Sequence, residues 1–553
     1  MSGSSKKKLR KEQYEAALTQ KQQTERKEAK KLKNYTITFV VAMVLVVAIM
    51  VGIIVAPTIT GIIHRNTHAI TIGNHELSTA QLCYFYMDEI NDYYTETYNN
   101  YYSSYGSMWQ LFLILNPDEP LNEQYYNEEK TLTWADHFMN EAIKSATTLY
   151  ALYDEGVANG FELSEEDQTT LDEYFKSIET TAKYNGYANA TAYLRASYGQ
   201  GATMNDFKDY YTANIYASRF FSDYCDSLEY TDEQIRAFEK DKVLNYTSFD
   251  YVIYTIQVDK YLGEGTKGED GKVTYSDEDR AAALAAAKAD ADALIASGAT
   301  TAEKLDEAIK GLTINKDNKN AKSTPYKNYF YESIGLEDIQ KWLADETRKA
   351  GDLTVIEGKV KETNADKTET EKVTALNVVL FQERDDNYTK LVNVRHILSQ
   401  YKNPYVDSEG NYQYNESTKK AAKEEAEKWL EEWKKGDATS DSFAELAKKY
   451  SADGSASNGG LYEDIYPGQM VEAFNDWCFD SSRKTGDTGI VETEYGCHVM
   501  YFEKTQDVTY RDYLIKNDMI EKDSEAWRTE LEKKISVTRV NLSGMDWDFT
   551  YAH

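Results

Sequence analysis

An uncharged apolar run near the N-terminus is the feature that most restricts how this chain can fold. It covers residues 37–63 and contains no Asp, Glu, Lys or Arg. About 20 apolar residues in a helix span the hydrocarbon core of a bilayer, so the run predicts a transmembrane helix. A buried core helix would show a polar stripe, which this run lacks. A cleaved signal peptide would have a shorter apolar region and a shorter leader than residues 1–34.

The charges on either side of the run predict its orientation. Residues 1–34 contain eleven Lys and Arg against four Asp and Glu, whereas the whole chain has a net charge of −31. Because basic flanks stay on the cytoplasmic side, we expect the N-terminus inside and residues 64–553 outside. The leader is either a solvated topology signal or a short helix on anionic lipid. The acidic exterior argues against general nucleic-acid binding, which needs cations to displace phosphate counterions.

The exterior begins with a mostly helical region and then changes period. A hairpin is expected over 68–77, with Ser78 capping the helix after it. Further helices are predicted at 134–156, 164–185 and 204–228. From Phe249 the pattern alternates like a strand. Two helices follow that strand, at 277–297 and 301–310, and the same order recurs as a strand at 392–399 with helices at 417–435 and 441–450. A helical stretch over 510–535 and a strand over 537–542 close the chain.

Five residue identities support an internal repeat. At a constant offset of 135 residues, Trp342, Arg348, Lys349, Gly351 and Asp352 match Trp477, Arg483, Lys484, Gly486 and Asp487. Each copy ends in an apolar strand, at 376–381 and 497–502. The identities and the matching element order predict two related α+β domains in tandem. The alternative for the first copy is an unrelated α+β domain.

The second copy carries five short motifs in one order. They are residues 394–398 (VRHIL), 443–451 (FAELAKKYS), 451–460 (SADGSASNGG), 467–474 (PGQMVEAF) and 493–499 (TEYGCHV). Through these motifs, residues 388–505 resemble the parvulin-type peptidyl-prolyl isomerases. The resemblance implies an isomerase (EC 5.2.1.8) that catalyses rotation about X–Pro peptide bonds. It also places His396 and His498 on neighbouring strands.

Rotation about an X–Pro bond asks little of a catalyst. The barrier of about 18–20 kcal/mol comes from amide resonance, and no bond breaks. The site must hold the ring in an apolar pocket and favour the twisted amide, so no metal or cofactor is expected. The resemblance implies that the catalytic residues are His396, Asp453, Thr493 and His498. Met470 and Phe474, four residues apart on one helix face, would bind the substrate together with Tyr462.

Two departures from the family pattern stand out. Leu461-Tyr462-Glu463 follows the Gly-Gly pair where many members have Asp-Leu-Gly, so Tyr462 replaces an aliphatic pocket wall. The first copy has Tyr251 near the position of His396 and Asn377 at that of His498. Nothing in it aligns with Asp453. We therefore expect the first copy to be a degenerate parvulin-like domain that kept the scaffold and lost the site.

The whole layout resembles the secreted parvulin foldases of the PrsA and SurA type. The expected parts are a basic cytoplasmic leader (1–34), a transmembrane anchor (35–63), a helical chaperone-like region (64–246), a degenerate parvulin-like domain (247–387), a parvulin domain (388–505) and a C-terminal helix packing back on the helical region (506–553). The resemblance implies a single-pass foldase on the outer face of a Gram-positive-type bacterial membrane, with unfolded secreted polypeptides as partners. The alternative is a non-catalytic holdase or assembly scaffold that uses its parvulin folds only to bind peptides.

Cysteine and tyrosine usage add weaker predictions. Cys83, Cys225, Cys478 and Cys497 lack CxxC or metal-ligand spacing. They are expected to be buried free thiols, or Cys478 and Cys497 to form a pair. Eight tyrosines between Tyr84 and Tyr105 offer rings that bind unfolded chains without sequence demands, although core packing is expected for most of them.

Overall fold

The computed structural model describes residues 7–8, 38, 41–46, 58–267, 273–363, 369–407 and 412–542. Of the transmembrane helix predicted at 37–63, residues 37, 39–40 and 47–57 lie outside the described part of the chain. Within the described residues, no helix combines the length and the apolar composition that crossing a bilayer requires. The chain packs as two units. Unit 1 comprises Met1–Leu228 with Glu521–His553, and unit 2 comprises Glu229–Ile520.

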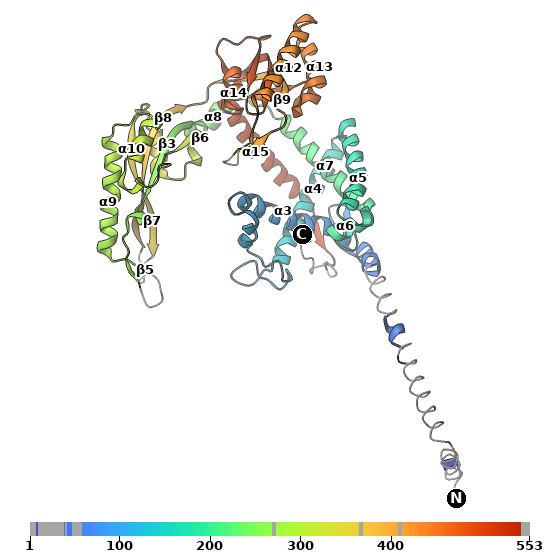
Figure 1. Cartoon of the computed structure of the whole chain (residues 1–553). Helices are drawn as coiled ribbons and strands as arrows, with labels where there is room; N and C mark the ends of the chain where they lie inside the picture. The colour runs from blue at the N-terminus through green and yellow to red at the C-terminus, as the bar shows by residue number, and fades with distance from the viewer. Residues whose placement is uncertain are drawn as a thin grey trace, which may run out of the picture. The chain divides into compact units, whose positions relative to one another are not determined.

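Unit 1 combines helices with a small antiparallel sheet (Figure 1). The sheet has the order β15-β1-β2, from Val537–Arg539, His68–Ile72 and His75–Ser78. The helices are α3 (Thr79–Tyr105), α4 (Trp134–Ala158), α5 (Glu165–Tyr184), α6 (Ala190–Tyr198) and α7 (Met204–Asp226), with a 3-10 turn η1 (Gly106–Phe112) after α3. The predicted hairpin and cap are confirmed: the Gln81 amide donates to Ser78 Oγ at 3.2 Å, and the Ser78 amide donates to Gln81 Oε1 at 2.9 Å.

The C-terminal half of the last helix and the strand after it pack inside unit 1. Helix α15 (Tyr510–Glu532) carries Trp527, whose ring stacks on Tyr224 of α7 with centroids 3.7 Å apart. After the helix, β15 pairs with β1 through Ile70 opposite Arg539. The tyrosines of α3 differ in burial, as expected for an amphipathic helix. Tyr84, Tyr86 and Tyr94 are buried, whereas Tyr98, Tyr102 and Tyr105 are exposed.

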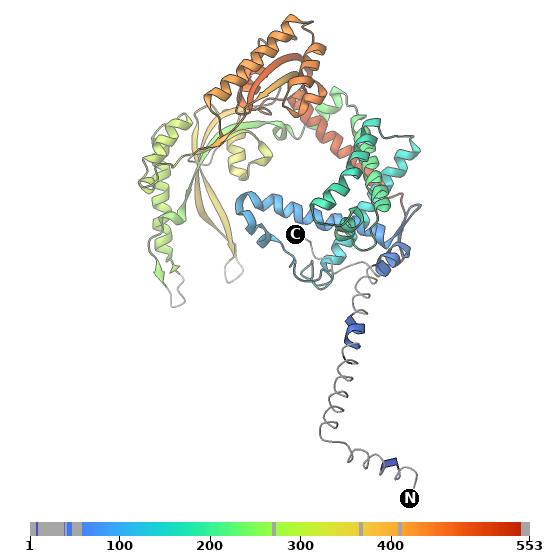
Figure 2. The same cartoon turned by 45° about the vertical axis from the view of Figure 1, so that its right-hand side comes forward.

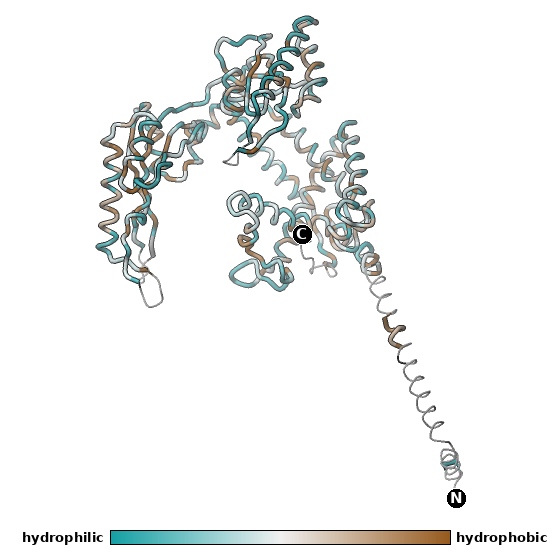
Figure 3. The backbone as a smooth tube through the Cα atoms, in the orientation of Figure 1, coloured by the Kyte–Doolittle hydropathy of each residue, from teal (hydrophilic) through white to brown (hydrophobic). Residues whose placement is uncertain are grey.

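Unit 2 contains two four-stranded antiparallel sheets with the same strand order. The first is β6-β3-β8-β7 and the second is β12-β9-β14-β13. The first sheet consists of β3 (Ser248–Gln257), β6 (Thr324–Phe330), β7 (Leu353–Thr363) and β8 (Glu369–Asp385), with helices α9 (Asp277–Ala296), α10 (Ala302–Lys310) and α11 (Glu337–Ala344). The second consists of β9 (Lys390–Gln400), β12 (Leu461–Ile465), β13 (Thr488–Glu492) and β14 (Gly496–Thr509), with helices α12 (Glu416–Lys435), α13 (Ser440–Tyr450) and α14 (Glu472–Phe479). Figure 3 shows hydrophobic residues along the strands and along α9.

A repeated clip fixes the edge of each sheet. In the first copy, Arg348 lies over the ring of Trp342 at 4.4 Å and its Nε donates to the Trp342 carbonyl at 2.9 Å. In the second copy, Arg483 lies over Trp477 at 4.3 Å and makes the same hydrogen bond at 2.9 Å. We call these two arrangements the arginine clips.

The turn after each clip repeats as well. Gly351 and Gly486 have φ of +94° and +91°, a region that favours glycine. Their amides donate to the carbonyls of Phe381 and Phe502, each at 2.9 Å. The offset-135 identities therefore mark one local structure built twice, and the sequence prediction of a shared element order is matched by the two sheets.

Strand register corrects one sequence expectation. Ile253 lies opposite Val379 in the first sheet, and His396 lies opposite Met500 in the second. Tyr251 lies opposite Phe381 and therefore corresponds to Val394, opposite Phe502. The position of His396 is thus occupied by Ile253 and not by Tyr251. The expected residue, Tyr251, is two positions away from the observed one. A shift of two residues keeps the side chain on the same face of the sheet but moves it to the next position on that face of the strand.

The first sheet extends beyond the second at one end. Pairing of β3 with β8 stops at Gln257 opposite Ala375, whereas β7 and β8 stay paired out to Thr363 opposite Glu369. At the equivalent place in the second sheet, β14 begins at Gly496 opposite Gln400. We call residues 359–363 and 369–374 the β7–β8 arm, which Figure 2 shows projecting from the sheet.

A buried arginine joins the segments around the two sheets. Arg511, at the start of α15, is 0% exposed and forms an ion pair with Glu239 of α8 (Asp232–Glu239). Its guanidinium also donates to the carbonyls of Val243 at 2.7 Å, Asp386 at 3.0 Å and Tyr246 at 3.1 Å. This explains why α8, which we expected with the helical region, belongs to unit 2.

Candidate active site

Alternation along two strands places the two predicted histidines on one face of the second sheet. On β14, Cys497 and Val499 pack under α12, while His498 and Met500 face α14. His396 of β9 lies on the same face as His498, and the two Nδ1 atoms are 3.0 Å apart. Both side chains are buried. Phe474 of α14 meets both imidazoles edge-on, with each centroid distance 5.4 Å.

The loop after α13 brings Asp453 to His396. The Leu398 amide donates to Ser451 Oγ at 3.0 Å, and the Ala452 amide donates to the Leu398 carbonyl at 3.0 Å, so the loop is attached to β9. Asp453 Oδ1 then lies 3.3 Å from His396 Nε2. The same oxygen accepts from the amide and the hydroxyl of Ser455, at 2.8 and 2.6 Å.

A glycine pair positions the tyrosine that departs from the family pattern. Gly460 has φ of +71°, and a Cβ there would lie 2.2 Å from the His396 carbonyl oxygen, so only glycine fits. This close approach lets β12 pair with β9. Tyr462 then stacks on His396, with centroids 5.0 Å apart, and its hydroxyl donates to Asp453 Oδ1 at 3.0 Å. Met470 packs half-buried in the same cluster as Phe474, but the expectation that both lie on one helix face is wrong, because α14 begins only at Glu472.

These contacts give the network one direction. A carboxylate only accepts hydrogen bonds, and the Ser455 hydroxyl already donates to Asp453, so His396 Nε2 must carry the proton. With the proton of His396 on Nε2, its Nδ1 accepts from His498 Nδ1. His498 Nε2 in turn accepts from the Thr493 hydroxyl at 2.8 Å, whose oxygen accepts from the Tyr495 amide at 3.2 Å. We assign these tautomers from the hydrogen-bond partners.

Burial and charge set the protonation of the network. Burial, together with the neighbouring His396, lowers the pKa of His498 to about 4, so His498 is neutral at pH 7. The hydrogen bond from His396, followed by those from Ser455, holds the pKa of Asp453 well below its usual range. Burial and the Asp453 charge raise the pKa of Tyr462. The site therefore holds an ionised Asp453 and a neutral His498.

The structure brings all seven predicted site residues together in one domain. Sequence reasoning missed Ser455 and Ser451, which hold the Asp453 loop. Their alternation with Asp453 in Ser451-Ala452-Asp453-Gly454-Ser455 was the available signal, because short polar side chains at that spacing bond neighbouring backbone amides. None of the four cysteines forms a disulfide in the described part of the chain. Cys478 and Cys497 pack in separate clusters on opposite faces of the sheet, so the pairing alternative is wrong.

The corresponding region of the first copy is apolar. By register, Ile253 stands for His396 and Tyr326 for Tyr462, and by the offset of 135 Ile339 stands for Phe474. Asn377 stands for His498, but its Oδ1 accepts from Thr255 Oγ1 at 2.9 Å within the sheet. Tyr326 stacks on Tyr251, with centroids 4.8 Å apart. The first copy thus has rings and aliphatic groups where the second has its polar network.

A family model matches this part of the chain. Residues 379–505 match the family described as "PPIC-type PPIASE domain". The second copy is a parvulin domain. The predicted resemblance to parvulin-type isomerases is therefore confirmed for this segment, and the seven clustered residues all lie within it.

The chain is similar to two curated relatives and to two solved structures, among others. Foldase protein PrsA 1 of Listeria innocua is 31% identical over 119 residues, which are 20% of this chain and 40% of that protein. Foldase protein PrsA of Staphylococcus epidermidis is 29% identical over 202 residues, 35% of this chain and 59% of that protein. The chain thus matches less than two thirds of the length of either relative. The crystal structure of PrsA from Bacillus subtilis is 16% identical, covers 76% of this chain and 92% of its own, and has a TM-score of 0.24. PrsA from Bacillus anthracis is 20% identical over 27% of this chain and 59% of its own, with a TM-score of 0.17.

Proposed function

We propose that this protein is a membrane-anchored extracytoplasmic foldase whose parvulin domain isomerises X–Pro bonds in unfolded secreted polypeptides. The observation that carries the proposal is the continuous chain of contacts from Thr493 through His498 and His396 to Asp453, next to Phe474. This chain lies in the segment that matches the PPIC-type family. The relatives named as foldases support the same class of activity.

The proposed mechanism uses burial and one fixed charge. Phe474, Met470 and the ring of Tyr462 hold the proline ring. The twisted amide has lost its resonance and is less polar than the planar one, so an apolar pocket favours it. The Asp453 carboxylate opposes the partial negative charge that a planar amide places on its oxygen. His396, His498 and Thr493 keep that carboxylate ionised and in place, so they act through electrostatics and need no bond to break.

The anchor proposal rests on the charge-free run at 37–63 and the basic leader before it. Protease added to intact cells should digest most of the chain and leave a short basic fragment in the membrane. Protection of residues 64–553 from protease would refute this orientation.

We assign client holding to unit 1. Beyond the buried part of α3, Tyr98, Tyr102 and Tyr105 are exposed, and Leu111 and Ile114 are 80% and 82% exposed. Exposed apolar groups of this density are typical of interaction surfaces. The first copy of the repeat is then a degenerate parvulin-like domain, because its site positions lack the polar network described above.

The alternative function is a non-catalytic holdase. The observation that favours it is Tyr462, whose ring and hydroxyl occupy the space beside Asp453. A protease-coupled assay with a proline peptide distinguishes the two on the exterior, residues 64–553. Catalysis that disappears in a His396→Ala variant supports the isomerase. A folded exterior with no rate above background would establish the holdase.

A further inference from the structure

The residue before His396 on β9 lies on the other face of the second sheet. Side chains alternate along a strand, so Arg395 shares its face with Ile397, which packs against α12 and α13, whereas His396 faces α14. Arg395 Nε donates to Glu503 Oε1 of β14 at 2.6 Å. The two side chains are 16% and 20% exposed, so this ion pair is largely withdrawn from water. Arg395 is thus fixed next to the active site without belonging to it.

A second nitrogen of the same guanidinium holds the end of a turn. Arg395 Nη1 donates to the carbonyls of Asn458 at 3.2 Å and of Gly459 at 3.0 Å. These carbonyls close the 3-10 turn η6 (Gly454–Asn458). Carbonyls at the end of a helical turn lack donors from the turn itself, and the guanidinium supplies them. A Cβ at Gly459 would lie 2.9 Å from Nη1, so the turn is packed tightly against the arginine.

The turn held in this way connects two residues of the active site. Asp453 precedes it as the N-cap, and its side chain accepts from the Ser455 amide. Gly460 follows it, and the Gly460 carbonyl accepts from the His396 amide at 2.9 Å. This bond starts the strand pairing that brings the Tyr462 ring onto His396. A displacement of η6 would therefore move the Asp453 carboxylate and the Tyr462 hydroxyl together.

The first copy of the repeat lacks this arrangement. Strand register places Val252 at the position of Arg395. Val252 is buried in the apolar core of the first copy, and its side chain offers no donor. Gln382 stands at the position of Glu503, since each is the unpaired residue of the same β-bulge. The copy without the polar network thus also lacks the arginine and its acidic partner.

We propose that Arg395 is a positioning residue for proline isomerisation, which holds η6 on β9 so that Asp453 and Tyr462 stay against His396. It touches no substrate and acts only through this turn. Its two nitrogens have separate tasks, because Nε pairs with Glu503 whereas Nη1 bridges the turn carbonyls. The inference rests on the proposed function for the reaction, but the contact between Asp453 and His396 can be measured without turnover.

The test separates these two tasks in the full chain in nanodiscs. Arg395→Lys keeps a cation beside Glu503, but one ammonium nitrogen does not replace two separate guanidinium nitrogens. We expect the midpoint of urea unfolding to stay near that of the wild type. In a protease-coupled assay, kcat for a proline peptide should fall at least about tenfold and KM should stay within about twofold, because a small displacement of a catalytic group lowers the rate steeply. Arg395→Met should lower both kcat and the midpoint.

A spectroscopic readout reports the position of the turn directly. In chains labelled with ¹⁵N-histidine, His396 should show a protonated Nε2 and an unprotonated Nδ1, as its hydrogen-bond partners require. Arg395→Lys should shift the His396 Nε2 signal, because Asp453 is no longer held against it. The signals of His75, which lies in unit 1, should stay unchanged and serve as the internal reference.

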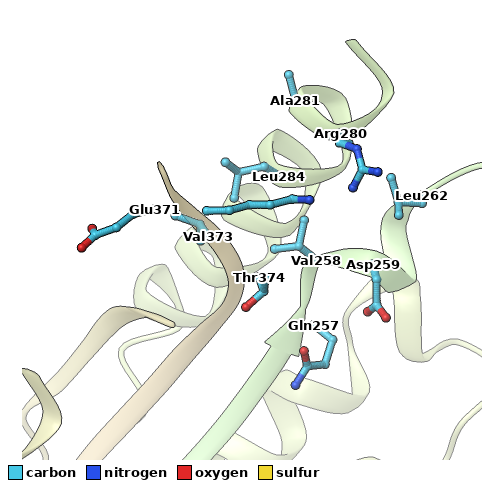
Figure 4. Close-up of a pocket in the computed structure, with 11 residues that line it drawn as sticks. Gln257, Val258, Asp259, Leu262, Arg280, Ala281, Leu284, Glu371, Val373 and Thr374 are labelled. Carbon is cyan, nitrogen blue, oxygen red and sulfur yellow. The ribbon is translucent and has the colours of Figure 1, made fainter. Parts of the chain in front are cut away.

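Two other arginines of unit 2 provide matched controls. Arg348 of the first clip is also partly buried and donates to a carbonyl, so Arg348→Met tests the effect of a general loss of stability. Arg280 lies at the rim of a pocket in the first copy, beside Leu262 (Figure 4). Arg280→Met therefore removes one positive charge without touching η6. Both variants should keep kcat within about twofold and should keep the wild-type His396 signals.

Three outcomes would overturn the proposal. Wild-type kcat in Arg395→Lys would show that the cation beside Glu503 is sufficient and that Arg395 only stabilises the fold. Unchanged His396 signals in that variant would show that the turn stays in place without the carbonyl contacts. An equal loss of kcat in Arg348→Met would show that any weakening of unit 2 has the same effect. If the wild-type chain shows no isomerase rate, the proposed function fails, and the His396 signals alone decide whether Arg395 holds the turn.

Discussion

The Nδ1 atoms of His396 and His498 lie 3.0 Å apart between two neighbouring strands, so one ring must donate to the other. Because Asp453 fixes the proton of His396 on Nε2, His498 is the donor and Thr493 completes the chain behind it. The direction of the hydrogen bonds in the site therefore follows from the position of the Asp453 carboxylate.

Removing that anion should separate the two proposed activities. We expect Asp453→Ala to lower kcat/KM for a proline peptide at least about tenfold, since the network loses its fixed charge. Suppression of aggregation of an unfolded client should persist, because we assign it to other surfaces. Asp437→Asn, an exposed carboxylate of the same domain, is the control and should keep full activity. Intact activity in Asp453→Ala would show that the loop has no catalytic role.

The Tyr462 hydroxyl should affect turnover more than binding. Tyr462→Phe keeps the ring on His396 but removes the hydrogen bond to Asp453, worth about 1.5 kcal/mol for a charged acceptor or roughly tenfold in rate. We expect kcat to fall and KM to stay within about twofold. Tyr466→Phe, whose ring stacks on Tyr510 away from the network, is the matched control. A change in KM alone would make Tyr462 a pocket wall only.

Acid should weaken the parvulin domain in two separate ranges. The folded pKa of His498, about 4, lies below the ordinary value of about 6.5, so the unfolded chain binds a proton first as pH falls. Stability is therefore lost between about pH 6.5 and 4, by a few kcal/mol at about 1.4 kcal/mol per unit. Asp453, with its lowered pKa, adds a further loss below about pH 4.

Histidine NMR checks this directly. The His498 Cε1 signal should stay that of a neutral ring down to about pH 4, and hydrogen exchange of β14 amides should quicken over the upper range. In a His498→Asn variant, the upper range should lose its pH dependence. A His498 signal that titrates near pH 6.5 would contradict the buried, neutral assignment.

How far the sequence could predict this arrangement depended on the kind of residue. Motif spacing predicted His396, Asp453 and His498 because each belongs to a short contiguous pattern. The correspondence of Asn377 with His498 was also predictable, because each residue lies in the apolar strand that follows an arginine clip. The Ile253 position was not, because it depends on cross-strand register, and the loops between the matching strands differ in length.

The β7–β8 arm was beyond the reach of sequence patterns. The first copy has about fourteen more residues than the second between its clip glycine and its last apolar strand, in the charged stretch 359–372, and no strand was predicted there. The structure makes them paired strands whose Lys and Glu lie across from one another, as in Lys361 and Glu369 at 3.2 Å. Cross-strand pairs of opposite charge stabilise a sheet, but the partners can be recognised only once the register is known.

The buried Arg511 should be a major source of stability in unit 2. Arg511→Met leaves Glu239 buried without its partner and three carbonyls without a donor, which costs about 3–5 kcal/mol. The midpoint of urea unfolding should fall accordingly. In the double variant with Glu239→Gln, part of the loss should return, because the stranded charge is gone. Additive losses in the double-mutant cycle would show that the two side chains act independently.

Thiol chemistry offers a test of the core. Burial raises the pKa of Cys478 to about 12 and also raises that of Cys497, so neither should react with iodoacetamide in the folded chain. Cys225 is only partly buried and should be alkylated first. Mass spectrometry of the folded and urea-unfolded chain would give the order. Early alkylation of Cys478 would mean that α14 does not stay packed on its sheet.

The two arginine clips have a consequence for how the chain reaches its native state. The two clips make the same contacts, and tandem copies that resemble each other are prone to exchange strands during folding. In such an exchange, β7 would pair with β14, or β13 with β8. The β7–β8 pairing contains a register shift at Gly358 and Lys359, whereas β13 and β14 pair without interruption. A strand placed in the wrong copy would therefore meet a mismatched ladder, so the divergence of the first copy works against strand exchange with the second copy.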